Sequence, residues 1–87
     1  MECSNKFEKL ENLAIELKDI ALCCSRSSIF DKTYNNIYSK KNFEFFKEME
    51  RIRVMEGYIV RLSGHWVEGI YTNNKYRVYD IVEYIPF

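Results

Sequence analysis

The sequence predicts a single α+β domain with a long N-terminal helix, one or two short helices and a C-terminal three-stranded antiparallel β-meander. Apolar residues recur every three or four positions from Phe7 to Cys24, which is the spacing of one helix face. Residues 57–87 instead contain all three glycines, the only proline and most of the tyrosines, a composition typical of strands separated by turns. A chain of 87 residues is the length of one domain, with a helical part at about 4–55 and strands at about 57–87.

The first predicted helix runs from about Asn5 to Cys24. Asn5 and Glu8 have the spacing of a capping box, and no glycine or proline interrupts the segment. Its apolar seam has the alternating three-and-four spacing of heptad positions and comprises Phe7, Leu10, Ala14, Leu17, Ala21 and Cys24. The seam predicts that this helix packs across the sheet. A homodimer formed through the 5–24 helix is the alternative.

The middle of the chain carries a weaker helical pattern. Residues 28–39 have roughly helical apolar spacing, but Asn35-Asn36 favours a turn, so a short helix and an ordered loop are both open. A second helix is predicted from about Asn42 to Arg51. Gly57 supplies a C-terminal stop for the helical part, because glycine adopts the left-handed conformation that ends many helices.

Three strands are predicted at 58–62, 66–72 and 75–85. The turn between the first two is Ser63-Gly64-His65, and Asn73-Asn74 is suited to the tip of a tight hairpin. Gly69 suggests a bulge within the second strand, and Pro86 ends the third because proline cannot donate to a β-ladder.

The predicted core joins one side of the first helix to the second helix and the sheet. Its members are Phe7, Leu10, Leu13, Leu17, Ile20, Phe45, Phe46, Met49, Ile59, Val67, Ile70, Val78 and Val82. In the third strand, strict alternation places 76, 78, 80, 82 and 84 on one side, yet both sides are partly apolar. A sheet covered on one face alternates more cleanly. Either a partner covers part of the second face, or the sheet curls strongly.

Composition bounds the classes of function. The apolar fraction of 47% and charged fraction of 30% are those of a globular protein. Thirteen basic and thirteen acidic residues balance, which removes the simplest argument for binding a polyanion. The three cysteines, two of them adjacent, do not form the even set of a disulfide framework, and no run of about 18 apolar residues indicates a membrane span. We therefore expect a cytoplasmic protein, in the host cytoplasm if a virus encodes it.

No catalytic, metal or cofactor signature is evident. Cys3 and Cys23 are separated by roughly 30 Å along a helix, so Cys3, Cys23, Cys24 and His65 cannot share one zinc ion. Cys24 is read as a small core residue and Cys23 as incidental. His65 is the only histidine, and no nucleophile or orienting carboxylate is placed beside it in sequence. Glu44 and Glu48, one helical turn apart, are expected to mark a solvated face.

Large rings on the predicted sheet favour a non-enzymatic protein-interaction module, since such rings make good interface anchors. The predicted partner-binding residues are Tyr58, Trp66, Tyr71, Tyr76, Arg77 and Tyr79. In size, composition and lack of motifs the chain is similar to the small inhibitors, such as anti-CRISPR proteins, that phages encode against host defence nucleases. The resemblance implies a host protein or nucleoprotein complex as the partner.

The alternative is an RNA-binding or RNA-cleaving module. Basic side chains interleaved with aromatic rings on strands can neutralise and stack on RNA. The residues for this function are Arg53, Arg61, His65, Lys75 and Arg77. N-terminal helices followed by an antiparallel sheet also resemble the architecture of small ribonuclease toxins. Interleaved Glu56, Glu68, Asp80 and Glu83 oppose a polyanion, so this function is the less favoured one.

Overall fold

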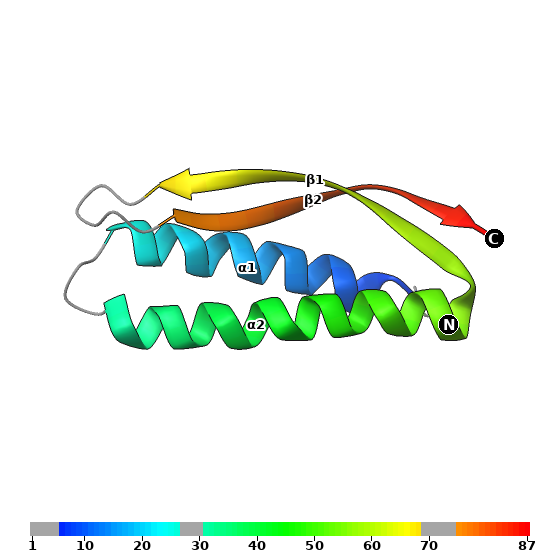
Figure 1. Ribbon diagram of the computed structural model, residues 1–87, viewed down its shortest axis with the longest axis horizontal. Coiled ribbons are helices and arrows are strands. Elements are labelled where there is room, and N and C mark those ends of the chain that lie inside the picture. Colours follow the sequence, from blue (N-terminus) through cyan, green and yellow to red (C-terminus); the bar gives the residue numbers. More distant parts are fainter. Residues whose placement is uncertain (1–5, 27–30, 69–74) are drawn as a thin grey trace.

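Two antiparallel helices lie side by side, and a long twisted β-hairpin lies over them (Figure 1). The computed structural model describes residues 6–26, 31–68 and 75–87. The elements are α1 (Glu8–Arg26), α2 (Asp31–Arg51), a π-helical turn (Ile52–Glu56), β1 (Tyr58–Glu68) and β2 (Lys75–Pro86). The α+β class is confirmed, but the sheet of the described residues has two strands, not three.

The predicted turn at Ser63-Gly64-His65 is wrong, because these residues form the middle of β1. Each has a partner across the antiparallel ladder: Asp80, Tyr79 and Val78 respectively. Continuous pairing with β2 thus outweighs the local turn preference of Ser-Gly. The predicted strands 58–62 and 66–72 are therefore one strand up to Glu68, while Gly69 and the Asn73-Asn74 tip lie outside the described residues.

From residue 31 onward, the weak helical pattern of 28–39 and the predicted helix 42–51 belong to one helix, α2, while residues 28–30 lie outside the described ranges. Asn35-Asn36 makes no turn, since Asn35 instead accepts a hydrogen bond from the Tyr76 hydroxyl of β2. Tertiary contact overrides the modest helix propensity of asparagine here. Gly57 ends the helical part as predicted, with φ of 76° in the left-handed region.

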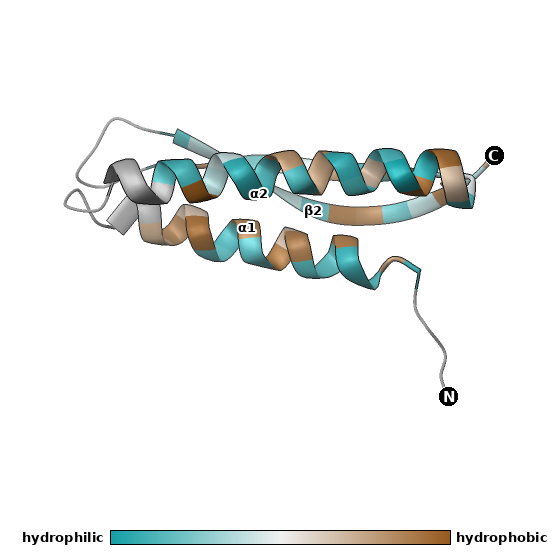
Figure 2. Cartoon of the chain, turned by 90° about the horizontal axis from the view of Figure 1, so that it is seen from below, coloured by the Kyte–Doolittle hydropathy of each residue, from teal (hydrophilic) through white to brown (hydrophobic). Residues whose placement is uncertain are grey.

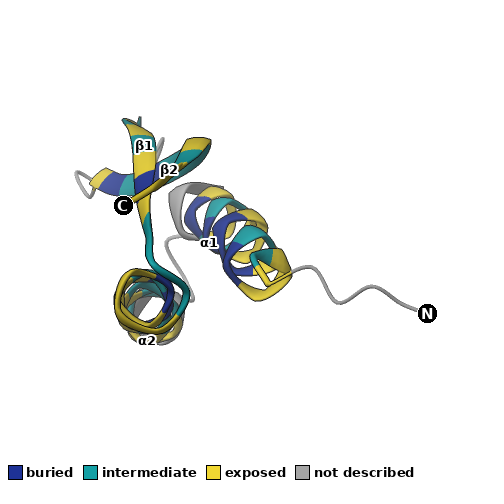
Figure 3. Cartoon of the chain, turned by 90° about the vertical axis from the view of Figure 1, so that its right-hand side faces the viewer, coloured by how far each residue is buried: buried dark blue, intermediate teal, exposed yellow. Residues whose placement is uncertain are grey.

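The core lies where α1 meets α2 and the hairpin. Hydrophobic residues recur on successive turns of α1 (Figure 2), and its buried side faces the other elements (Figure 3). The buried apolar residues are Leu10, Leu13, Ala14, Leu17, Ala21, Phe45, Ile52, Val60, Tyr76 and Val78. The described part of the α1 seam is therefore used within the chain, and a dimer through this seam requires unpacking it.

Three predicted core residues are largely exposed: Phe46, Ile59 and Val82. For Ile59 the reason is strand parity, because Val60 points to the helices and its neighbour must point away. For Val82 the reason is a β-bulge. Arg61 pairs with Glu83 and Leu62 with Ile81, so Val82 is the extra residue between them. Ile70 lies outside the described residues.

The bulge and the helix packing together explain why both sides of β2 are apolar. Tyr76 and Val78 pack with Ala21 of α1. Tyr79, on the opposite side of the strand, stacks on Phe45 of α2 with ring centroids 5.3 Å apart and planes at 12°. Beyond the bulge the parity shifts, so Tyr84 joins the side of Tyr79 instead of that of Val78. Helices thus cover both sides of β2 at different points.

Candidate protein-interaction surface

The structure separates the six predicted partner-binding residues by burial. Trp66 is 59% exposed on β1, and Tyr76 is buried in the core. Tyr58, Arg77 and Tyr79 are half-buried, and Tyr71 lies outside the described residues. Of the predicted partner-binding residues that the structure describes, Trp66 is therefore the most accessible.

Trp66 belongs to a contact chain that crosses the hairpin and ends on α2. Trp66 and Arg77 are direct cross-strand partners, and the guanidinium carbon of Arg77 lies 5.3 Å from the Trp66 ring centre. The same carbon lies 5.8 Å from the Tyr79 ring. Phe46 meets Tyr79 edge-on, with centroids 5.3 Å apart. We call these four residues (Trp66, Arg77, Tyr79 and Phe46) the Trp66 cluster.

Gly64 makes room for the guanidinium in this cluster. It lies on the same side of β1 as Trp66 and directly opposite Tyr79. A Cβ atom at Gly64 would lie 2.6 Å from Nη2 of Arg77, closer than any ordinary contact. The bare backbone of Gly64 therefore leaves space for the Arg77 guanidinium within cation–π distance of both the Trp66 and the Tyr79 ring. Sequence reasoning assigned this glycine to a turn and missed its role.

Tyr38 of α2 fixes the backbone of Arg77. Its hydroxyl donates to the Arg77 carbonyl oxygen at 2.5 Å and accepts from the Arg77 N–H at 3.1 Å. The Tyr38 ring also meets Tyr76 edge-on, 5.2 Å between centroids. No sequence signal singled out Tyr38, because its partner is 39 residues away. The cluster is thus held at its backbone as well as through its side chains.

Tyr58 and Tyr84 serve the fold near the other end of the hairpin. Phe7 stacks on Tyr84 with centroids 3.7 Å apart and meets Tyr58 edge-on at 5.2 Å. The Tyr84 hydroxyl donates to a Glu11 oxygen at 3.1 Å. Burial and the neighbouring carboxylate of Glu11 together raise the pKa of Tyr84 well above its ordinary value.

The residues of the nucleic-acid alternative are dispersed and mostly neutralised. Arg53 pairs with Glu50 at 2.5 Å, and Arg61 pairs with Glu83 at 2.7 Å. Lys75 is exposed and sits across the ladder from Glu68. Among the described residues, Arg77 alone of this set has an aromatic environment instead of an acid beside it.

His65 lies in the strand, exposed, with Nδ1 3.8 Å from Asp80. This carboxylate, which sequence reasoning did not foresee, is hydrogen-bonded to Lys18 of α1. The Lys18 hydrogen bond lowers the pKa of Asp80 below its ordinary value. Asp80 therefore joins the hairpin to α1.

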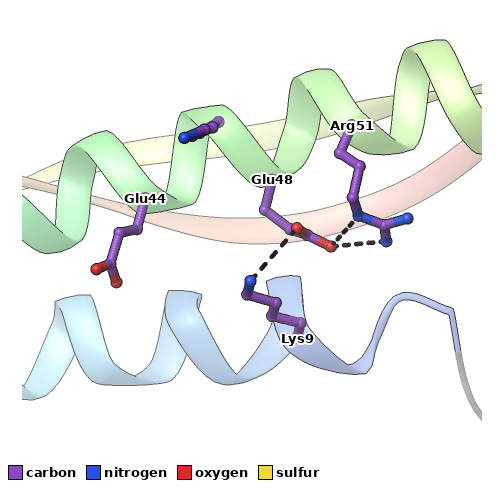
Figure 4. Close-up of a pocket in the computed structure, with 5 residues that line it drawn as sticks. Lys9, Glu44, Glu48 and Arg51 are labelled. Carbon is purple, nitrogen blue, oxygen red and sulfur yellow. Dashed lines mark hydrogen bonds and ion pairs between the residues drawn. The ribbon is translucent and has the colours of Figure 1, made fainter.

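A groove of about 410 Å³ lies between α1 and α2, lined by Lys9, Glu44, Lys47, Glu48 and Arg51 (Figure 4). Glu48 is only 4% exposed, so its expected place on a solvated face is wrong. One Glu48 oxygen accepts from Nε and Nη2 of Arg51 at 2.9 and 2.7 Å, and the other lies 4.0 Å from Lys9. Three of the five charged residues that line the groove, Lys9, Glu48 and Arg51, are thus paired with one another.

Further site types have no support in the described ranges. No three His, Cys, Asp or Glu side chains there are arranged to hold a metal ion. No helix there is both long enough and apolar enough to cross a membrane. The Cys23 thiol is exposed on α1, while Cys3 and the Cys24 side chain are outside what the structure describes.

No known family model matches the chain, and neither a curated protein nor a solved structure is significantly similar to it.

Proposed function

We propose that this protein is a non-enzymatic protein-interaction module that binds its partner through the Trp66 cluster. The observation that carries the proposal is Trp66 itself, a 59% exposed indole in cation–π contact with Arg77, whose own backbone is fixed by Tyr38. Trp66 belongs to neither cluster of core residues, so core packing does not account for an indole at this position.

The composition and rigidity of the cluster favour strong contacts. Trp, Tyr and Arg are the residue types most enriched at energetic hot spots of protein interfaces. Arg77 is already held between two rings, so binding immobilises few additional rotamers and loses little side-chain entropy. An exposed cation–π pair is worth about 0.5–1 kcal/mol, and this increases when a partner removes it from water.

Charge supports a protein partner over a nucleic acid. The arginines at 51, 53 and 61 are each paired with carboxylates, and the chain has no net charge. Nucleic-acid affinity depends on cations available to replace counterions along the phosphate backbone. The likeness to phage-encoded inhibitors in size, composition and lack of motifs makes a host defence complex the partner class to test first.

Quantitative affinity capture from a cell lysate tests the proposal. Immobilised wild-type protein is compared with Trp66→Ala and with Ile15→Ala, which removes a 58% exposed apolar side chain from α1 instead. We expect Trp66→Ala to reduce partner recovery by about tenfold or more, the effect of a hot-spot residue. Ile15→Ala should retain the partner. Equal recovery by all three proteins, each shown to be folded by circular dichroism, contradicts the assignment.

A further inference from the structure

The hydrogen bonds between Tyr38 and Arg77 indicate which backbone groups of β1 point away from β2. Tyr38 takes both the N–H and the C=O of Arg77, so these groups do not bond to Trp66 across the ladder. Trp66 and Arg77 are therefore a non-hydrogen-bonded pair, and such pairs alternate along an antiparallel ladder. It follows that the N–H and C=O groups of Leu62, Gly64 and Trp66 point to the outer edge of β1.

The hydrogen bond at the far end of the hairpin leads independently to the same alternation of hydrogen-bonded and non-hydrogen-bonded pairs. Phe87 donates its N–H to the Gly57 carbonyl at 3.0 Å, so this pair is hydrogen-bonded. The next pair, Tyr58 with Pro86, must then be non-hydrogen-bonded, and Pro86 has no N–H to donate. Alternation from this end again turns the backbone groups of the even-numbered residues of β1 outward.

The two edges of the hairpin differ. β2 lies beside α1 (Figure 1). The backbone groups of Arg77 at the edge of β2 are hydrogen-bonded to Tyr38. In the described ranges, no backbone group outside the hairpin pairs with the outer edge of β1. Neither proline nor a bulge interrupts this edge, since the 11 residues of β1 include no proline and the extra residue of the bulge is on β2.

Charge indicates what kind of strand this edge accepts. On one side of the hairpin, β1 carries Arg61, whose Nε binds Glu83 of β2 at 2.7 Å and whose side chain is 58% exposed. A strand added outside β1 lies directly beside Arg61, with Glu83 one strand further away, so an acidic side chain is favoured opposite Arg61. On the other side it meets Leu62, Gly64 and Trp66, so apolar side chains are favoured.

We propose that the outer edge of β1, from Leu62 to Trp66, binds an extended segment of the partner as a third strand, with acidic and apolar residues alternating in that segment. The inference rests on the proposed function, because the same segment would contact Trp66. A second copy of this chain fits less well. Antiparallel pairing of two β1 strands offers Arg61 no acidic partner, because Glu68 is the only acidic residue of β1 and lies on the other face of the strand.

Hydrogen exchange of the full chain, followed by NMR, tests the edge directly. The probe is a blocked octapeptide of alternating glutamate and valine, with an alternating lysine–valine octapeptide as its control. At saturating glutamate peptide, we expect the amides of Leu62, Gly64 and Trp66 to exchange about tenfold more slowly. The amides of Ser63 and His65, which already bond to β2, should change little. Arg61→Gln should weaken binding of the glutamate peptide, whereas Arg53→Gln, which alters an arginine of the π-helical turn, should not.

Three results overturn the inference. The first is that millimolar glutamate peptide does not change the exchange rates of the Leu62, Gly64 and Trp66 amides. The second is equal protection by the lysine peptide. The third is protection that rises with protein concentration without peptide, which assigns the edge to a second copy. If Trp66→Ala abolishes partner capture while the peptide leaves these amides unaffected, the proposed function stands and the edge inference falls.

Discussion

The guanidinium of Arg77 lies across the backbone of Gly64, a residue of the neighbouring strand that is offset by two positions from its direct partner Trp66. This diagonal placement puts the cation 5.3 Å from the Trp66 ring and 5.8 Å from the Tyr79 ring. Any side chain at Gly64 would occupy the space of Arg77 Nη2. The shape of the Trp66 cluster thus depends on one missing Cβ atom.

Gly64→Ala should displace Arg77 with little loss of stability. The clash involves the end of a flexible side chain, so the free energy of unfolding should change by less than about 1 kcal/mol. The indole should lose its cation, and Trp66 fluorescence, from the only tryptophan, should shift in the folded protein. Ser63→Ala, in the same strand on the opposite side, is the control. An emission spectrum of Gly64→Ala identical to wild type contradicts the arrangement.

Phe45 and Phe43 of α2 form a matched pair for the core. Phe45 is fully buried against Tyr79 and α1, whereas Phe43 is 67% exposed. Phe45→Ala should lower the free energy of unfolding by about 3–5 kcal/mol, since it leaves a cavity, while Phe43→Ala should change it by less than about 0.5 kcal/mol. Urea denaturation of both variants checks this. Equal effects would mean that α2 packs through a different face.

Glu48 and Glu50 test the groove between the helices. Buried Glu48 holds Arg51, which also reaches Glu56 at 3.2 Å and the Lys6 carbonyl at 3.3 Å. Glu48→Ala should therefore cost about 1–3 kcal/mol, because it breaks a network that joins α2 to the start of α1. Glu50→Ala breaks only the exposed pair with Arg53 and should leave the free energy of unfolding nearly unchanged. Thermal denaturation of the two variants should separate them, and a harmless Glu48→Ala refutes the structural role.

Tyr84 should make the fold sensitive to alkali. Its pKa is raised in the folded protein, so the unfolded chain releases this proton at lower pH than the folded one. The contribution is constant below the ordinary tyrosine pKa near 10, and stability then falls as pH rises further. Tyr84→Phe keeps the ring on Phe7 and removes the hydroxyl. Urea midpoints from pH 8 to 11 should show a smaller alkaline decline in Tyr84→Phe, and an unchanged decline counts against the assignment.

Local pattern was sufficient to predict α1 but not the hairpin. The seam from Leu10 to Ala21 has uninterrupted helical spacing, and packing agrees with it. Ser63-Gly64-His65 has turn composition, yet pairing with residues 78–80 decides its conformation. Val82 fits a regular alternation in sequence, so the bulge that isolates it depends on the register of the other strand. Non-local contacts determined each of these differences.

Sequence pattern likewise predicted some residues of the candidate site but not how they are brought together. Trp66, Arg77 and Tyr79 were identifiable from residue type and position on strands. Their assembly was not, because it depends on Gly64 across the ladder and on the Tyr38 hydroxyl from α2. Tyr76 is the same residue type as Tyr79 and lies on the same predicted strand, but its ring lies in the core beside Ala21. The two tyrosines differ in burial. Sequence pattern does not predict burial for a strand that is covered on both sides.

Acrylamide quenching of Trp66 in the complex with its captured partner tests the central claim most directly, because all indole fluorescence of this chain comes from that residue. A partner lacking tryptophan, or one in which its tryptophans are replaced by phenylalanine, keeps the signal specific. The account predicts a blue-shifted emission and quenching reduced severalfold at saturation, with the same concentration dependence as complex formation. A complex that forms fully while Trp66 remains as accessible to acrylamide as in the isolated protein would contradict it.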